Sequence, residues 1–182
     1  MRKPQKIFLR ICTALTVWAV LIVSTGTQGC FNPFAPKLEE LMSGSDMVVT
    51  NQQSPEEVLQ NFAVAYAFKD SLLYSDIIDT AFVFVYFDPE SGTSGRYVSW
   101  GREVDLKTTG SLFRYFHAVD LVWSSTLFEL VGDSAGTVGR GFSLTLVGEK
   151  EYYEISGRSV FSFRKCADGR WRIVQWKDES DL

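Results

Sequence analysis

Four segments of alternating apolar and polar residues fill the second half of the chain and constrain its fold more than any other feature. Short turns separate them, at 132–133, 148–149 and 167–169. Alternation of this kind is typical of an antiparallel sheet that has one face covered and the other more polar. We therefore predict a meander of four strands, with Leu121, Trp123 and Leu127 on the covered face of the first. The four segments are Val119 to Val131, Ala135 to Val147, Tyr153 to Phe163 and Trp171 to Trp176.

Helix signals come before the meander. Ser54, Pro55 and Glu57 have the spacing of a capping box with proline at the first helical position. Apolar residues then follow at helical spacing, so this helix has one strongly apolar face. A shorter helix is expected at 72–78, a strand at 81–87, a loop at 90–95 and a third helix at 102–116. The sequence therefore predicts an α+β domain, with about three helices packed on an antiparallel sheet.

This element order, the capped first helix and the closing pattern Trp171-x-Ile173-x-x-Trp176 resemble the NTF2-like superfamily, which includes SnoaL-type and ketosteroid isomerase-like proteins. The resemblance covers about Ser54 to Glu179. It implies a cone, formed by the helices and a curved antiparallel sheet, whose hollow interior holds a ligand or an active site, although many members carry out no chemistry. It also implies a homodimer formed through the sheet, for which exposed Val174 and Trp176 beside Arg172 would be the sign.

The first thirty residues predict where in the cell the protein is located. Four basic residues precede an uncharged run from Ile11 to Val23, and small polar residues then lead to Cys30. This pattern is that of an export signal rather than a spanning helix. Gly29-Cys30 resembles the end of a lipobox, although Thr27 and Gln28 depart from the usual residues. An uncleaved anchor and an ordinary secretory signal are the alternatives.

We accordingly expect a lipoprotein-type signal peptide at 1–29, a tether at 30–53 and an NTF2-like domain at 54–182. Acyl chains on Cys30 would attach the protein to the membrane. Phe31 is not the aspartate that, in enteric bacteria, retains lipoproteins at the inner membrane. The expected location is therefore the bacterial cell envelope, on the outer membrane and facing the periplasm.

Charge and missing motifs exclude several functions. The chain has 18 basic and 22 acidic residues, and four of the basic residues leave with the signal peptide. An acidic body without a Lys/Arg cluster argues against nucleic acid as a partner. One histidine and one remaining thiol, Cys166, cannot supply a zinc-ligand set. The chain has no Walker loop, dinucleotide fingerprint or Gly-x-Ser-x-Gly, so we expect neither metal nor cofactor.

Catalysis has two weak candidates, Asp88 and His117. The resemblance places the isomerase-type base of the superfamily at Asp88, but Phe62 stands where that group has its oxyanion tyrosine. Asp88-Pro89 is also ordinary turn chemistry after a strand. His117 is the lone histidine and either acts as a base or caps the end of the third helix.

Ligand binding has six candidates, which are Tyr66, Tyr86, Trp100, Trp123, Arg140 and Tyr153. The aromatic residues either line a pocket for a flat or apolar ligand or form the ordinary core of the sheet. Alternation places Arg140 on the covered face, where it would meet an anionic ligand or an acidic side chain, unless a bulge at the flanking glycines turns it outward.

The sequence thus favours an envelope-anchored lipoprotein with a non-catalytic NTF2-like domain that binds a small apolar ligand or a protein partner. A small isomerase- or dehydratase-type enzyme that uses Asp88 or His117 is the first alternative. A structural dimerisation module is the second.

Overall fold

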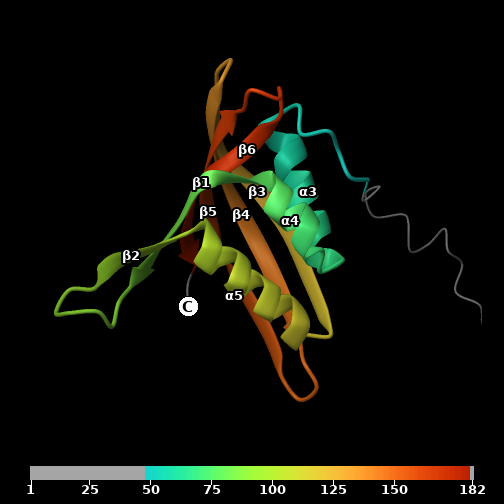
Figure 1. Cartoon of the computed structure of the whole chain (residues 1–182). Helices are drawn as coiled ribbons and strands as arrows, with labels where there is room; N and C mark the ends of the chain where they lie inside the picture. Colours follow the sequence, from blue (N-terminus) through green and yellow to red (C-terminus); the bar gives the residue numbers. More distant parts are fainter. Residues whose placement is uncertain (1–47, 181–182) are drawn as a thin grey trace, which may run out of the picture. The chain divides into compact units, whose positions relative to one another are not determined.

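Three helices and six strands make up the part of the chain, residues 48–180, that the computed structural model describes (Figure 1). The α+β class is confirmed. The strand β2 was not expected, because its residues are largely exposed and its alternation is weak. In chain order, the elements are α3 (Pro55–Ala67), α4 (Ser71–Ile77), β1 (Ile78–Asp88), β2 (Arg96–Gly101), α5 (Arg102–Tyr115), β3 (Ala118–Val131), β4 (Ala135–Val147), β5 (Tyr152–Lys165) and β6 (Trp171–Ser180).

The sheet is mixed rather than fully antiparallel. Its strand order is β2-β1-β6-β5-β4-β3, and β3 to β6 form the expected antiparallel meander. However, β1 pairs with β6 in parallel. A parallel pair needs a long crossover connection, and β2, α5 and the meander supply one here. The expectation of an all-antiparallel sheet is therefore wrong at this one pair.

The first helix begins as its sequence predicts. The Ser54 hydroxyl accepts a hydrogen bond from the Glu57 N–H at 3.2 Å, with Pro55 at the first helical position. The Glu57 carboxylate accepts one in return, but from the N–H of Gln53 rather than Ser54, at 2.7 Å. Two N–H groups are thereby satisfied at the helix start, and the buried face of α3 is set against the sheet.

Irregular register in β3 corrects one expected burial. The pairing of β3 with β4 shifts between Trp123 and Thr126 and again between Thr126 and Phe128. Leu127 is therefore 45% exposed instead of sharing the covered face with Leu121 and Trp123. Each such shift changes which side chains of a strand point inward.

A second irregularity, in β6, corrects the expected outer surface. In the pairing of β5 with β6, Gln175 lies opposite Ser162 and Ile173 lies opposite Phe163, so Val174 is an extra residue. Ile173 and Trp176 consequently point to the same face, and the Trp176 ring lies 5.3 Å from the Phe62 ring. Trp176 is thus an interior residue, and the apolar outer patch expected to indicate a dimer loses its main member.

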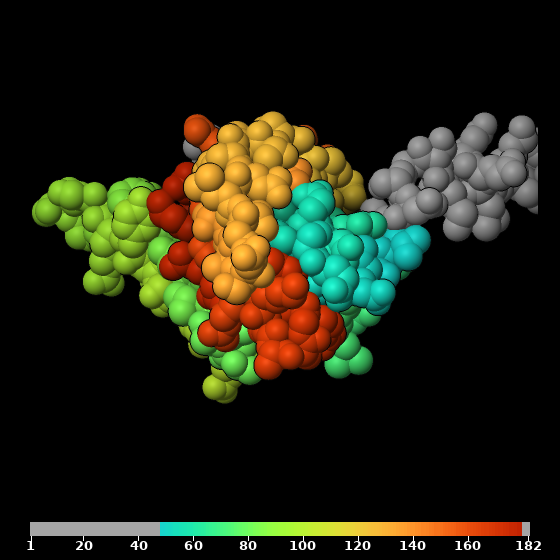
Figure 2. Space-filling view, turned by 90° about the horizontal axis from the view of Figure 1, so that it is seen from above, coloured from blue at the N-terminus to red at the C-terminus, as the bar shows by residue number. Residues whose placement is uncertain are grey.

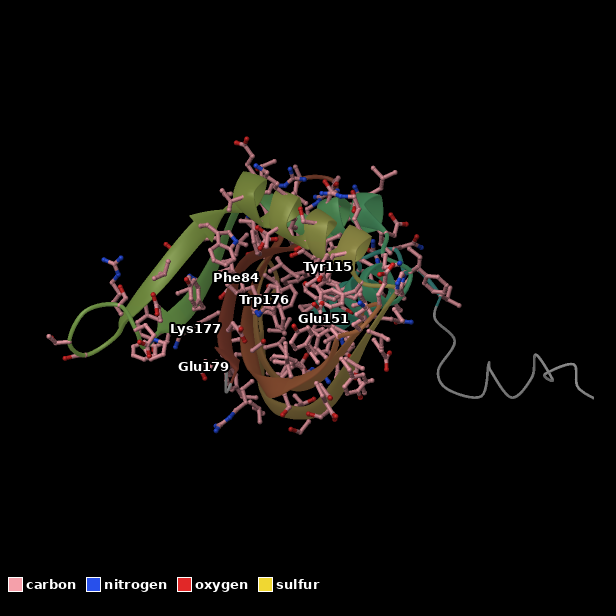
Figure 3. The ribbon with its side chains drawn as sticks, turned by 90° about the horizontal axis from the view of Figure 1, so that it is seen from below. Phe84, Tyr115, Glu151, Trp176, Lys177 and Glu179 are labelled. Atoms are coloured by element: carbon pink, nitrogen blue, oxygen red, sulfur yellow. The ribbon has the colours of Figure 1, made fainter. Side chains whose placement is uncertain are left out.

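The inner face of the sheet is covered with side chains. Seen from below, the long strands bend around Phe84 and Trp176, whereas Lys177 and Glu179 point away on the other side of the ribbon (Figure 3). Buried residues from all three helices pack against the same face and form one hydrophobic core with it. The core therefore lies between the helices and the sheet.

The described domain begins before residue 54. Gln52 is 2% exposed, and its carbonyl accepts a hydrogen bond from the Trp171 N–H at 2.8 Å. Thr50 donates its N–H to the Asn61 side chain at 2.7 Å. Thr50 and Gln52, near the end of the expected tether, thus pack against the domain. No helix within 48–180 has the length and hydropathy needed to cross a membrane.

Candidate functional site

The two expected catalytic residues, Asp88 and His117, both lie where a helix or strand ends. Asp88 ends β1, and its carboxylate accepts a hydrogen bond from the Glu90 N–H at 3.0 Å, which is a turn. His117 is exposed between α5 and β3. Its backbone N–H donates to the Val147 carbonyl, and its backbone carbonyl accepts from the Lys69 ammonium at 3.1 Å. Neither side chain has a described partner that would activate it.

Aromatic rings fill the centre of the fold around Phe62. Its ring stacks on Tyr66 at 4.8 Å and contacts Tyr74 at 5.4 Å, and it lies within 5.8 Å of the rings of Trp123, Phe161 and Trp176. Phe62 is 1% exposed. We call these six residues the aromatic interior. It lies between the helices and the inner face of the sheet, where the resemblance implies a ligand cavity.

The expected ligand-binding aromatics fall into three groups. Tyr66 and Trp123 belong to the aromatic interior, and the Trp123 indole donates to the Leu59 carbonyl at 2.9 Å. Tyr86 and Trp100 pack around Phe84, with Trp100 stacked on it at 4.5 Å. Tyr153 is 48% exposed and contacts Phe116 instead. The Trp176 ring lies 4.8 Å from the Phe84 ring, so the first two groups are parts of one connected core, and Tyr153 lies at its exposed edge.

Arg140 points inward and pairs with an acidic side chain. The pairing of β4 with β5 is continuous through Arg140, so no bulge of β4 against that neighbour turns it outward. Its guanidinium forms an ion pair with Glu56 of α3, and its side chain is 12% exposed. The Arg140 Nε is buried without a described partner. Arg140 thus joins β4 to the start of α3.

A buried carboxylate that the sequence analysis missed lies at the other side of the core. Asp105 is 3% exposed, accepts a hydrogen bond from the Tyr74 hydroxyl at 2.6 Å and accepts another from the Trp100 indole at 3.1 Å. Burial raises the pKa of Asp105, against the lowering effect of these two hydrogen bonds. Burial also raises the pKa of Tyr66 and of Tyr74, and the neighbouring Asp105 carboxylate adds to both effects.

The Asp105 cluster ties three elements together. Its members come from α4, β2 and α5, and both carboxylate oxygens have donors. Helical spacing could have revealed it, since Asp105, Thr109 and Phe113 share the buried face of α5. A carboxylate with a raised pKa is a candidate acid or base. Its near-complete burial, however, leaves little surface for a substrate.

A polar pocket of about 560 Å³ lies where α4 runs into β1. Its walls include Ser75 and Asp76 of α4, Asp79 of β1, Arg102 of α5, Arg164 of β5 and Arg172 of β6. Viewed from above, the red-orange residues around the β5–β6 turn lie beside the green residues of the α4–β1 junction (Figure 2). These residues come from five elements, which is why no basic cluster was visible in the sequence.

Arginines that line this arginine-lined pocket form ion pairs within it or beside it. Arg164 contacts Asp79 at 2.7 Å, and Arg172 contacts Asp168 at 2.6 Å. Burial alone would raise the pKa of Asp79, but hydrogen bonds from the Ala81 N–H and the Arg164 guanidinium hold that pKa below its usual value. The Cys166 thiol lies 3.5 Å from the same carboxylate. Within the described part of the chain, no three His, Cys, Asp or Glu side chains are grouped as metal ligands are.

Solved structures of other proteins are similar to this chain in fold. An NTF2-like superfamily protein from Salmonella enterica serovar Typhimurium is 14% identical, with a TM-score of 0.56 over 69% of this chain and 87% of that chain. A candidate dehydratase of the NTF2-like family from Streptomyces avermitilis is also 14% identical, with a TM-score of 0.57 over 72% of this chain and 96% of that chain. The domain has the NTF2-like fold. A conserved protein from Planctomyces limnophilus is 12% identical, with a TM-score of 0.59 over 69% of this chain and 91% of that chain.

The likeness is one of fold alone. No protein-family model matches the chain, and no curated protein matches it either. The described part of the chain has an aromatic interior, a buried Asp105 cluster and a separate arginine-lined pocket. The functional interpretation therefore depends on these three features rather than on the activity of any similar protein.

Proposed function

We propose that the chain is an envelope-anchored lipoprotein whose NTF2-like domain is a non-catalytic binding domain. The observation that carries this proposal is the aromatic interior, where Phe62 lies within ring-contact distance of five other aromatic side chains. Close-packed rings exclude a substrate from that space. The ligand or partner therefore binds outside the interior.

The location of the protein in the cell envelope is part of the same proposal. The basic start, the apolar run and the small residues before Cys30 support export and lipidation. Residues 1–29, Cys30 and most of the tether lie outside the described residues. A small apolar ligand of the kind expected from the sequence has no room among the interior rings, so a surface ligand or a protein partner is favoured.

The second candidate is a dehydratase- or isomerase-type enzyme. One observation favours it, namely the carboxylate of Asp105, which burial shifts towards the neutral form in the presence of two tyrosines. Candidate dehydratases share the fold. Such a reaction needs a base and oxyanion donors around a bound substrate, so the interior would first have to open.

Complementation of a deletion strain separates the two proposals. Asp88→Asn, His117→Gln and Asp105→Asn should each restore the function that deletion removes, provided that the variant is folded and localised as the wild type is. A bulky charge at Trp123, whose indole binds α3, should abolish it through loss of the fold. Loss of function in a folded, correctly localised Asp105→Asn variant would contradict the binding proposal and support the enzyme.

A further inference from the structure

We propose that the arginine-lined pocket binds a small organic anion through its oxyanion group, a carboxylate or a phosphate monoester. This inference deepens the binding function proposed above by naming its site and the class of its ligand. Its central residue is Arg102, the first residue of α5.

Arg102 is held in place but has no described acidic partner. Its Nη2 donates to the Ser75 carbonyl at 2.9 Å and to the Ser75 hydroxyl at 2.7 Å. No ion pair within residues 48–180 involves it, and its Nε is buried without a partner. A guanidinium that is partly buried and left without a counter-charge is unfavourable. An anion in the pocket would supply that charge.

The remaining charges of the pocket compensate one another. Arg164 pairs with Asp79, Arg172 pairs with Asp168, and Arg170 pairs with Asp76 at 2.6 Å. Each carboxylate near the pocket therefore already has a guanidinium. Arg102 leaves an excess of positive charge there, although the whole chain has a net charge of −4.

Arg164 offers a second donor to the same ligand. Its side chain is 53% exposed, and its described contact with Asp79 uses one guanidinium nitrogen, Nη2. Guanidinium groups match the planar geometry of carboxylates and the oxygens of phosphates, which a lysine does not do as well. Arg102 and Arg164, which both line the pocket, are thus suited to an oxyanion.

The size and the apolar part of the pocket indicate an organic ligand. A volume of about 560 Å³ is well above that of a single inorganic ion and falls in the range of small-molecule sites. Ile78 and Leu72 also line the pocket, and Leu72 is 84% exposed. These side chains would contact the carbon skeleton while the arginines hold its anionic end.

Isothermal titration calorimetry on the full-length chain tests this inference, at low ionic strength and in a nonionic detergent. The probes are benzoate, phenyl phosphate and inorganic phosphate, with chloride as the reference anion. We expect at least one organic probe to bind in the micromolar to millimolar range and inorganic phosphate to bind more weakly. Salt should weaken the binding, because the contact is partly exposed.

Variants identify the residue that carries the binding. Arg102→Gln should weaken the binding of the organic probe by about tenfold or more. Arg102→Lys, which keeps the positive charge but loses the forked hydrogen-bond donors of the guanidinium, should have an intermediate effect. Arg158→Gln, an exposed position on β5 that does not line the pocket, is the matched control and should stay within about twofold of the wild type. Thermal unfolding of each variant checks its fold.

Two results would overturn the inference. One is the absence of saturable binding of every organic probe to the wild-type chain. The other is equal affinity in a folded Arg102→Gln variant and in Arg158→Gln. Neither result would affect the filled interior, so the binding-domain proposal would remain to be judged by complementation.

Discussion

At the scale of single residues, the protonation state of the buried Asp105 carboxyl group affects the stability of the fold. Its pKa is raised in the folded protein, so ionisation is harder there than in the unfolded chain. A group of this kind contributes stability below its unfolded pKa, near 4, and loses that contribution as the pH rises through its folded pKa.

Asp105→Asn should remove this pH dependence. An amide can still accept from the Trp100 indole and donate to the Tyr74 hydroxyl, so we expect the variant to fold. The stability of the wild type minus that of the variant should fall as the pH rises above about 4 and level off once the pH has passed the raised pKa of Asp105, by about 1.4 kcal/mol for each pH unit that separates the two pKa values. Urea unfolding at several pH values measures it, and a pH-independent difference would contradict the raised pKa.

Phe62 is the residue on which the aromatic interior depends. Phe62→Ala should lower the free energy of unfolding by about 3–5 kcal/mol, because the ring is fully buried and its removal leaves a cavity. Leu72→Ala is the control, since that side chain is mostly exposed, and should change stability by less than about 0.5 kcal/mol. A loss below about 1 kcal/mol for Phe62→Ala would show that the interior is not packed around it.

At the scale of elements, α3 is joined to the sheet by one partly buried ion pair. Glu56→Gln should destabilise the domain by about 1.5–3 kcal/mol, since it leaves the Arg140 guanidinium buried beside an uncharged amide. Arg140→Met should cost less, under about 1.5 kcal/mol, because an apolar side chain of similar length suits the neighbouring Val138 and Phe142. Chemical denaturation gives both values, and the reverse order would contradict the assigned pairing.

The elements themselves were largely predictable from the sequence. The capping box at Ser54 predicted the start of the first helix, and the alternation after Val119 predicted β3 and β4 to within one residue. The last strand runs to Ser180, four residues beyond the predicted end at Trp176. The strand β2 and the inward orientation of the Trp176 side chain were not predictable. The first is a short, exposed edge strand, and the second depends on a single extra residue, Val174, that alternation does not reveal.

The sites were less predictable than the elements, for a physical reason. The arginine-lined pocket draws its residues from α4, β1, α5, β5 and β6, which only the tertiary structure brings together. The hollow interior was inferred from the resemblance alone, whereas the packing of five aromatic rings around Phe62 depends on residues far apart in the sequence. Asp105 had a local signal in the spacing of α5, and that signal was overlooked.

At the scale of the whole molecule, attachment to the membrane through Cys30 can be tested by one substitution. If Cys30 is acylated, Cys30→Ser should release the protein from membranes or block its processing, because the acyl chains provide the attachment. Membrane fractionation and the electrophoretic mobility of the mature form measure this. Unchanged processing together with full membrane retention would contradict the lipoprotein proposal.

The central claim is that this NTF2-like domain has a filled interior and binds its ligand or partner elsewhere. Benzene binding measured by calorimetry tests that claim most directly, since an apolar cavity in a protein binds such a probe. The chain from Phe31 onward should show no saturable binding, whereas the cavity left by Phe62→Ala should bind one molecule and Leu72→Ala should behave as the wild type. Saturable one-site binding by the wild type, with a change in tryptophan fluorescence, would show an open interior and contradict the account.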